Sequence, residues 1–197
     1  AAIPVQTFDQ DQMTQAGMES AQDLALLSPA LGISAGGGPL TSFFVRGVGA
    51  LTVNPLTDSA VAQNFDGVYL GRSSGAAGQG LYDLERVELL KGPQGTLYGR
   101  NATGGVINYI PVKPMLGENS GFIQGEVGDY SKVGLQGAAN IAVSDTVAIR
   151  ISGNSLDRDG YSDDDTNDQD SYSLRGQLLF EPNDKLSIRL SADYSKV

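Results

Sequence analysis

The sequence predicts a mixed α and β body followed by a run of antiparallel β-strands. Up to Pro114, helical spacing, hairpin signals and glycine-rich loops follow one another closely, which is typical of a domain built from both kinds of element. From Gly121 onward, apolar and polar residues alternate with a period of two, as in strands that have one apolar face. We therefore expect two domains, over residues 1–118 and 119–197.

One helix and one hairpin are expected in the first half of the body. Ser20 can cap a helix that Pro29 ends, because the apolar residues between them follow helical spacing. Asp66-Gly67 predicts a two-residue hairpin turn, since Asp and Gly tolerate a positive φ. The stretches between these elements are glycine- and serine-rich loops, and they cover residues 34–41, 49–58 and 72–80.

Residues 81–110 carry the most informative pattern of the chain. Charged and apolar residues interleave up to Lys91, which suits a strand half buried in a core, and Gly92-Pro93 then breaks the strand. The stretch 99–105 is too rich in glycine for a helix. It leads into the mainly apolar residues 106–110, for which we expect a second strand.

Five segments of about ten residues each make up the alternating part, and about ten residues is the length that crosses a bilayer when strands are tilted. Short turns at 144–145 and 182–184 alternate with a long acidic loop at 157–171, as in outer-membrane barrels. A soluble β-sandwich also alternates, so the strands alone leave both architectures open. The five segments lie near residues 120–129, 132–143, 146–156, 171–181 and 185–195.

The composition excludes several classes of function. The 197 residues contain no cysteine and no histidine, so thiol and imidazole catalysis, disulfides and zinc sites made from these residues are excluded. The net charge of −10 argues against a nucleic-acid partner, because a phosphate-binding protein needs a basic face. The glycine-rich segments lack the full spacing of the nucleotide-binding motifs, and we expect no cofactor.

Much of the negative charge lies in residues 157–170, which contain seven Asp and one Arg and so carry a net charge of −6. Within this stretch, Asp163, Asp165 and Asn167 have the spacing of alternate ligands in an EF-hand calcium loop. The glycine and the final glutamate of that motif are missing. We therefore expect a solvated loop and no metal site, with calcium binding as the alternative.

The stretch from Glu85 to Asn108 matches the pattern E-R-V-E-x-L-x-G-P-x-G-x-L-Y-G-x-x-x-x-G-G-x-I-N. In this segment the chain closely resembles the plug domain of TonB-dependent outer-membrane receptors. The resemblance extends to further segments, which match the opening strand and helix of the plug, a strand ending in Arg-Gly and an internal hairpin. These segments are residues 3–5, 20–33, 43–47 and 66–69.

The resemblance decides between the sandwich and the barrel. It implies an α+β plug domain followed by antiparallel β-strands of a transmembrane β-barrel. Such a barrel has about 22 strands, so five strands would be an incomplete part of it. No basic and apolar leader precedes Ile3, and the short energy-coupling box of the family is not found. We expect both to lie outside this sequence.

The resemblance also implies a function. Members of the family bind a scarce extracellular nutrient, most commonly a ferric siderophore, in the outer membrane of a Gram-negative bacterium. TonB, driven by ExbB and ExbD, then opens the plug from the periplasmic side, and no chemical bond is made or broken. Oligosaccharide and cobalamin transport are alternatives within the family. A soluble periplasmic or extracellular binding module, or a transporter that also signals to transcription, would be rivals outside this reading.

Two cations lie where the family places the contacts that hold the plug against barrel-wall carboxylates. Arg46 follows the strand FFV, and Lys91 precedes Gly-Pro. The match is good for Arg46, whereas lysine cannot make the two-pronged contact that arginine makes with a carboxylate. The alternative is that both are solvated surface charges, worth under about 1 kcal/mol each.

The ligand in this family contacts the apical loops of the plug. By position these are the loops at 34–41, 49–58 and 72–80, and Arg72 could meet an anionic group of the ligand. The alternative is that these polar residues serve turn formation only. By the same resemblance, arginines on the polar side of the strands, Arg150, Arg175 and Arg189, would face the lumen. The candidate ligand contacts are Asn54, Asp58, Arg72, Ser73, Ser74 and Gln79.

Overall fold

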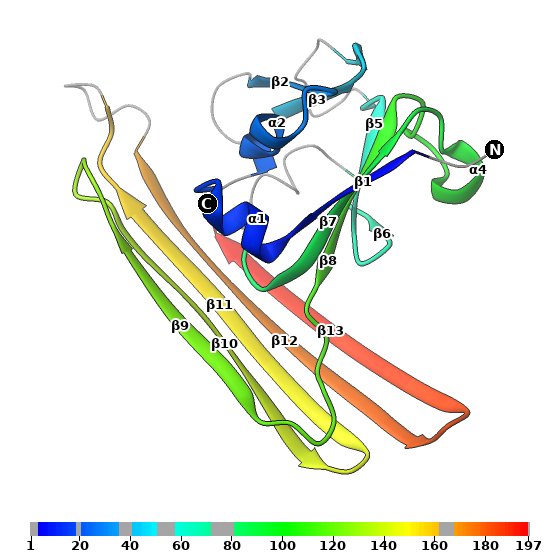
Figure 1. Cartoon of the computed structure of the whole chain (residues 1–197), viewed down its shortest axis with the longest axis vertical. Helices are drawn as coiled ribbons and strands as arrows, with labels where there is room; N and C mark the ends of the chain where they lie inside the picture. Colours follow the sequence, from blue (N-terminus) through cyan, green and yellow to red (C-terminus); the bar gives the residue numbers. More distant parts are fainter. Residues whose placement is uncertain are drawn as a thin grey trace. The chain divides into compact units, whose positions relative to one another are not determined.

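The structure is a computed structural model that describes residues 4–18, 21–35, 41–50, 58–71, 81–161 and 168–196. Contacts divide the chain into two compact units, Ala1–Pro111 and Val112–Val197, and we describe each by itself (Figure 1). No helix in the described part of the chain is long and apolar enough to cross a membrane.

A five-stranded sheet is the frame of the first unit. Its central strands β7 and β8 pair antiparallel, β1 pairs antiparallel with β7 at one edge, and β5 runs parallel to β8. The strands expected at 81–91 and 106–110 are thereby confirmed, and Gly92 breaks the first of them with a φ of 95°. In spatial order the strands are β1 (Val5–Asp9), β7 (Leu84–Lys91), β8 (Gly105–Pro111), β5 (Val61–Phe65) and β6 (Val68–Tyr69).

A second, three-stranded sheet contains β2 (Leu31–Ala35), β3 (Thr41–Val45) and β4 (Val48–Gly49). The strand expected at 43–47 therefore ends two residues earlier, because Arg46 and Gly47 adopt positive φ and turn the chain back. The sequence does not predict β2, because the expected helix ends at Pro29 and a loop is expected from residue 34. Residues 31–35 form a strand because they pair with β3, and the stability of a strand depends on its neighbouring strand more than on its own local sequence.

The helices of the first unit are short. The helix expected after Ser20 is present as a 3-10 turn, Ala21–Asp23, followed by α2 (Leu24–Leu27). Sequence reasoning missed α1 (Gln10–Gln15) and α4 (Gly95–Tyr98). The signal for α1 was the Asp9-x-x-Gln12 spacing, which forms a capping box: the Gln12 N–H donates to Asp9 Oδ1 at 2.8 Å.

The core of the first unit lies against the β7–β8 pair, whose apolar side chains alternate toward it. Val87 and Leu89 on β7 and Ile107 on β8 are at most 1% exposed. Side chains from α1, α2, β1, β2, β3 and β5 complete the same cluster. They include Phe8, Met13, Leu24, Leu31, Phe43, Val45 and Val61.

Gly104 and Gly105 allow the β3–β4 hairpin to pack directly on the backbone of this sheet. A Cβ on Gly105 would lie 2.5 Å from the Leu90 carbonyl oxygen and 3.1 Å from Val45 Cγ2. A Cβ on Gly104 would lie 2.7 Å from the Val48 carbonyl oxygen. Backbone atoms cannot yield at such distances, so the double glycine is required by close approach.

The second unit is a five-stranded antiparallel meander in which every strand pairs with its neighbour in sequence (Figure 1). This confirms the five strands expected from the alternation, and none of the described residues between 132 and 195 lies in a helix. The strands are β9 (Ser120–Val127), β10 (Val133–Ser144), β11 (Val147–Arg158), β12 (Gln169–Asn183) and β13 (Leu186–Lys196).

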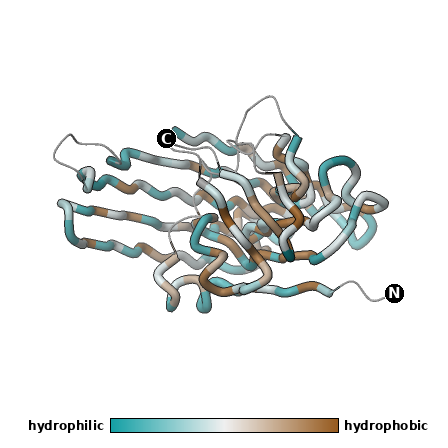
Figure 2. The backbone as a smooth tube through the Cα atoms, turned by 90° about the horizontal axis from the view of Figure 1, so that it is seen from above, coloured by the Kyte–Doolittle hydropathy of each residue, from teal (hydrophilic) through white to brown (hydrophobic). Residues whose placement is uncertain are grey.

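The register of the meander gathers the apolar residues on one face. Ile141 faces Ile149, which faces Leu178, which in turn faces Leu190. The neighbouring row on the opposite face is polar and joins Asn140, Arg150, Gln177 and Ser191. Hydrophobic and hydrophilic residues accordingly alternate along these strands (Figure 2).

Exposure of the two faces is the reverse of that in a water-soluble sheet. On the apolar face, Leu135, Leu174 and Leu190 are 54%, 55% and 61% exposed. On the polar face, Arg150 and Arg175 are buried, and Arg175 Nε lies 2.5 Å from Asp193 Oδ1. A large exposed apolar surface needs an apolar partner, which for this face can be lipid.

Two side-chain amides fasten the segment that precedes β9 to the polar face. Asn140 Oδ1 accepts from the Met115 N–H at 2.9 Å, and its Nδ2 donates to the carbonyls of Met115 and Glu118 at 2.9 and 2.6 Å. Gln177 Nε2 donates to the Val112 carbonyl at 2.8 Å. The start of the second unit is thus held by side chains of β10 and β12.

We predict that Gly105→Ala destabilises the first unit by about 1–3 kcal/mol, the usual cost of forcing extra atoms into a packed site. The added methyl would meet a carbonyl oxygen at 2.5 Å. Urea unfolding of the chain in detergent, followed by circular dichroism, measures the loss. Gly95→Ala is the matched control, because nothing lies within 4 Å of its Cβ position. Equal stability of the two variants would contradict the packing argument.

We predict that the first unit loses stability as the pH rises above about 10, the ordinary pKa of tyrosine. Burial raises the pKa of Tyr109, which is 4% exposed, above that value. In the unfolded chain this hydroxyl ionises near pH 10, whereas in the folded chain it stays protonated to a higher pH. The contribution of Tyr109 to the free energy of unfolding is therefore fully present below pH 10 and is lost as the pH rises above it. Tyr109→Phe should reduce the alkaline loss in urea midpoints measured at pH 8 and pH 11. Identical losses in both proteins would contradict this assignment.

Candidate functional site

The β7–β8 ladder places candidate functional residues at both of its ends. At one end Lys91 faces Gly105, and at the other Arg86 faces Ile110. The loop between the two strands folds back at the first end, where the Gly92 N–H donates to the Gly104 carbonyl at 3.0 Å.

The two cations predicted to contact the barrel wall lie at the same end of the sheet. Arg46 is exposed in the β3–β4 turn, and its N–H donates to the Ala30 carbonyl at 2.7 Å. Its neighbour Val45 lies against Gly105, which is the strand partner of Lys91. The Lys91 ammonium is half-buried and donates to Gln6 Oε1 at 2.7 Å. Contact of either cation with a barrel carboxylate stays a prediction.

One of the six predicted ligand contacts, Asp58, lies within the described residues. It is exposed at the end of a predicted apical loop. The calcium alternative at residues 163–167 falls outside the described residues, as do five of the predicted ligand contacts. Those five are Asn54, Arg72, Ser73, Ser74 and Gln79.

Asp58 belongs to a polar cluster that also contains Tyr69, Arg100 and Asn101. Asn101 Nδ2 donates to Asp58 Oδ1 at 3.1 Å and to the Tyr69 hydroxyl at 2.6 Å. The Arg100 guanidinium lies 5.7 Å from the centre of the Tyr69 ring, within the range of a cation–π contact. Asn101 has a φ of 66°, which asparagine adopts more readily than most residues. We call these four residues the loop-base cluster.

The loop-base cluster joins the ends of two predicted apical loops. Asp58 closes the loop at 49–58, and the Tyr69 hydroxyl donates to the Gly71 carbonyl, at 3.4 Å, just before the loop at 72–80. Sequence reasoning missed Tyr69, Arg100 and Asn101 as site residues. Tyr69 belongs to the hairpin at 66–69, and Arg100 and Asn101 belong to the glycine-rich stretch 99–105. Nothing in the local sequence of either segment predicts that the two segments contact each other.

The loop-base cluster offers a cation, an aromatic ring and fixed amide and carboxylate groups. This set suits non-covalent recognition of a polar ligand with charged groups. Among the residues that the structure describes, no group of three or more His, Cys, Asp or Glu side chains could hold a metal ion.

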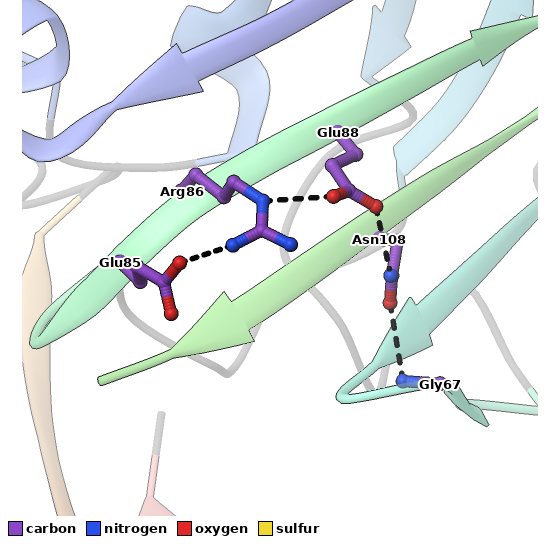
Figure 3. Close-up of polar contacts among 5 residues, drawn as sticks. All are labelled: Gly67, Glu85, Arg86, Glu88 and Asn108. Carbon is purple, nitrogen blue, oxygen red and sulfur yellow. Dashed lines mark hydrogen bonds and ion pairs between the residues drawn. The ribbon is translucent and has the colours of Figure 1, made fainter. Parts of the chain in front are cut away.

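A second polar network lies across the β7–β8 pair, from its middle toward Arg86 (Figure 3). Arg86 pairs with Glu85, and its Nε donates to Glu88 Oε1 at 2.8 Å. The hydrogen bond to Glu88 raises the pKa of Arg86 above its ordinary value. Asn108 Nδ2 donates to Glu88 Oε2 at 3.3 Å, and Asn108 Oδ1 accepts from the Gly67 N–H at 3.2 Å.

This network makes one physical unit of three sequence motifs. Arg86 and Glu88 belong to E-R-V-E, Asn108 to G-G-x-I-N, and Gly67 to the hairpin turn between β5 and β6. Asn108 bridges β7 to that turn because its amide both donates and accepts. Tyr69 of the loop-base cluster follows Gly67 by two residues, so the same hairpin serves both sites.

We predict that Asn108→Asp destabilises the first unit by about 1–3 kcal/mol, because a carboxylate cannot donate to Glu88 and repels it. Adding Glu88→Gln should recover part of the loss, since the new amide can donate to the new carboxylate. Urea unfolding of the single and double variants measures the coupling. Additive losses would show that Asn108 and Glu88 act independently and would contradict the network.

Comparison with known proteins identifies close relatives. The family model described as TonB-dependent Receptor Plug Domain matches residues 1–106. The pesticin receptor of Yersinia pestis is 37% identical over 117 residues, covering 59% of this chain and 17% of that protein. The iron-regulated outer membrane virulence protein of Vibrio cholerae is 31% identical over 178 residues, covering 81% of this chain and 26% of that protein.

Solved structures share the fold of both units. The ferric yersiniabactin uptake receptor FyuA from Yersinia pestis matches with a TM-score of 0.86 and 25% identity, over 98% of this chain and 31% of that chain. The pyoverdine receptor FpvA from Pseudomonas aeruginosa matches with a TM-score of 0.82 and 21% identity, over 99% of this chain and 28% of that chain. The chain thus spans less than a third of the length of these relatives.

Proposed function

Because the chain belongs to the family of TonB-dependent receptor plug domains, we propose that it forms the plug and first barrel strands of an outer-membrane transporter for ferric siderophores. The names of similar proteins support the substrate class: one is a ferric yersiniabactin uptake receptor, and another was solved with bound pyoverdine. Oligosaccharide and cobalamin receptors remain alternatives within the same family.

The single observation that carries this proposal is the inverted polarity of the second unit. Its exposed face is apolar across all five strands, and Tyr172 and Tyr194 stand on that face with ring centres 5.9 Å apart. An apolar band with tyrosines near one rim is typical of lipid-facing barrel strands. A soluble periplasmic or extracellular module would have to hide this face from water, so the observation favours outer-membrane lipid as its neighbour.

Ligand recognition is proposed for the loop-base cluster and the loops that it supports. The Arg100 guanidinium and the Tyr69 ring provide a cation and an aromatic surface for an iron chelate with anionic groups. Arg72, together with Asn54, Ser73, Ser74 and Gln79, would extend this surface. Arg46 and Lys91 are proposed to hold the plug against barrel carboxylates.

Transport in this proposal is binding followed by movement of the plug. The ligand binds from outside, and TonB, energised by ExbB and ExbD, opens the plug from the periplasmic side. No covalent bond forms or breaks in these steps, so the proposal assigns no enzymatic activity. Residues 1–118 would act as the plug domain and residues 119–197 as the first barrel strands.

We predict that the full-length receptor supports uptake of radioactive iron from at least one ferric siderophore, and that uptake stops when TonB is absent. Iron-starved cells lacking their own receptors are supplied with catecholate, hydroxamate or carboxylate chelates. Labelled cobalamin and a labelled oligosaccharide are tested in parallel.

Deletion of the receptor gene is the control for background uptake. If the receptor supports uptake of cobalamin or oligosaccharide but of no ferric siderophore, that compound would replace ferric siderophore as the proposed substrate. Uptake that persists without TonB would contradict energy-coupled transport.

A further inference from the structure

We propose that Gln6 and Lys91 form a clasp that fastens the edge strand β1 to the rest of the first unit. The clasp consists of Gln6 on β1, Lys91 at the end of β7, and Ser28 at the end of α2. Its role is to set how easily the strand nearest the N-terminal end separates from the sheet. The functional meaning of this step rests on the proposed function, in which the plug is pulled open.

Packing alone holds β1 weakly. The strand lies at an edge of the five-stranded sheet and pairs only with β7, through five residue pairs. Phe8 is its one buried side chain, and Val5 is 50% exposed. A strand with so little core contact depends on its polar contacts more than the central strands do.

The Gln6 carboxamide joins three elements through both of its polar atoms. Its Oε1 accepts from Lys91 Nζ at 2.7 Å and from the Ser28 hydroxyl at 2.9 Å. Its Nε2 donates to the Leu27 carbonyl at 3.3 Å. That carbonyl lies in the last turn of α2, where helical carbonyls have no partner within the helix.

Burial makes the junction costly to break. Ser28 is 0% exposed, and the Lys91 side chain is half-buried. If Gln6 leaves, the Ser28 hydroxyl and the Leu27 carbonyl lose their contact with the Gln6 carboxamide, and the Lys91 ammonium loses an acceptor. Donors and acceptors left without partners away from water destabilise a fold more than the same loss at the surface. The side chain of Gln6 therefore resists separation of β1.

The position of the clasp suits a load that arrives along the preceding chain. Val5 pairs with Leu90, so Lys91 stands beyond the strand pair and its N–H donates to the Pro4 carbonyl at 3.1 Å. Gln6 is the diagonal neighbour of Lys91 across the two strands. A pull on residue 4 meets the Pro4 hydrogen bond first and the clasp next, before the Phe8 contact.

Lys91 can serve the clasp without giving up its predicted contact with the barrel. An ammonium has three N–H donors, and one of them is used by Gln6. Separation of β1 would free that donor. The strand and the predicted plug–barrel contact are thereby linked through a single side chain.

Amide hydrogen exchange of the full-length receptor in detergent, read by mass spectrometry, tests the clasp. We expect Gln6→Ala and Lys91→Met each to accelerate exchange in the peptide covering Val5–Asp9 by about tenfold or more, because opening of β1 then loses a buried polar contact. The double variant should exchange no faster than the faster single variant. Thr7→Ala, an exposed change on the same strand, is the control and should stay within about twofold of the wild type.

Ser28→Ala is the milder variant in case Gln6→Ala disrupts the whole unit, and it too should accelerate exchange of β1. The peptide covering Gly105–Pro111 reports on the central sheet and should keep wild-type exchange in every variant. Wild-type exchange of β1 in Lys91→Met or in Ser28→Ala would overturn the clasp. Equal acceleration of β8 and β1 would overturn it too, because the effect would then be a general loss of stability.

These exchange rates do not depend on transport. A receptor that takes up no ferric siderophore but shows the expected exchange would refute the proposed function and leave the clasp standing. A receptor that transports ferric siderophore normally but shows wild-type exchange in the variants would refute the clasp and leave the proposed function standing.

Discussion

The antiparallel pairing of β7 with β8 is the interaction on which the first unit depends. The pair lies at the centre of the sheet order, and its buried residues, Val87, Leu89 and Ile107, contribute to the main core cluster. Both candidate sites depend on this pair. The loop-base cluster lies by the loop that connects the two strands, and the Glu88–Asn108 network lies across them. A shift in the register of this pair by one residue would turn the core residues outward and separate the partners of both sites.

Close approach of backbones is the second requirement of this arrangement. Gly104 and Gly105 stand where β8 begins, and the β3–β4 hairpin lies directly on them. The same contact brings Arg46 to the end of the sheet that carries Lys91. Two glycines thus position a pair of cations that lie 45 residues apart in the sequence, although neither glycine carries a charge.

The strands of the first unit differ in how many neighbours they pair with and in how many of their side chains are buried. β7 and β8 are paired on both sides and are rich in buried residues, whereas β1 is an edge strand with one buried side chain. Local stability follows such differences in burial and pairing, so β1 can separate at a lower cost than the centre of the sheet. In the proposed function, this gradient would let β1 separate under load before the central sheet yields.

The sequence by itself determined the strand architecture of the second unit, since a period of two fixes which residues share a face whatever the neighbours are. It also determined the β7–β8 segment and the Asp66-Gly67 turn, because glycine, proline and aspartate act through their own backbone preferences. The family resemblance of its motifs led to Asp58 as a candidate ligand contact, which stays a prediction, and the structure adds the contact of Asp58 with Asn101. The tertiary structure alone decided β2, which is a strand only because β3 pairs with it, and the Lys91–Gln6 contact between residues 85 positions apart. Local propensity cannot report such contacts, because their energy comes from atoms that the folded chain brings together from distant parts of the sequence.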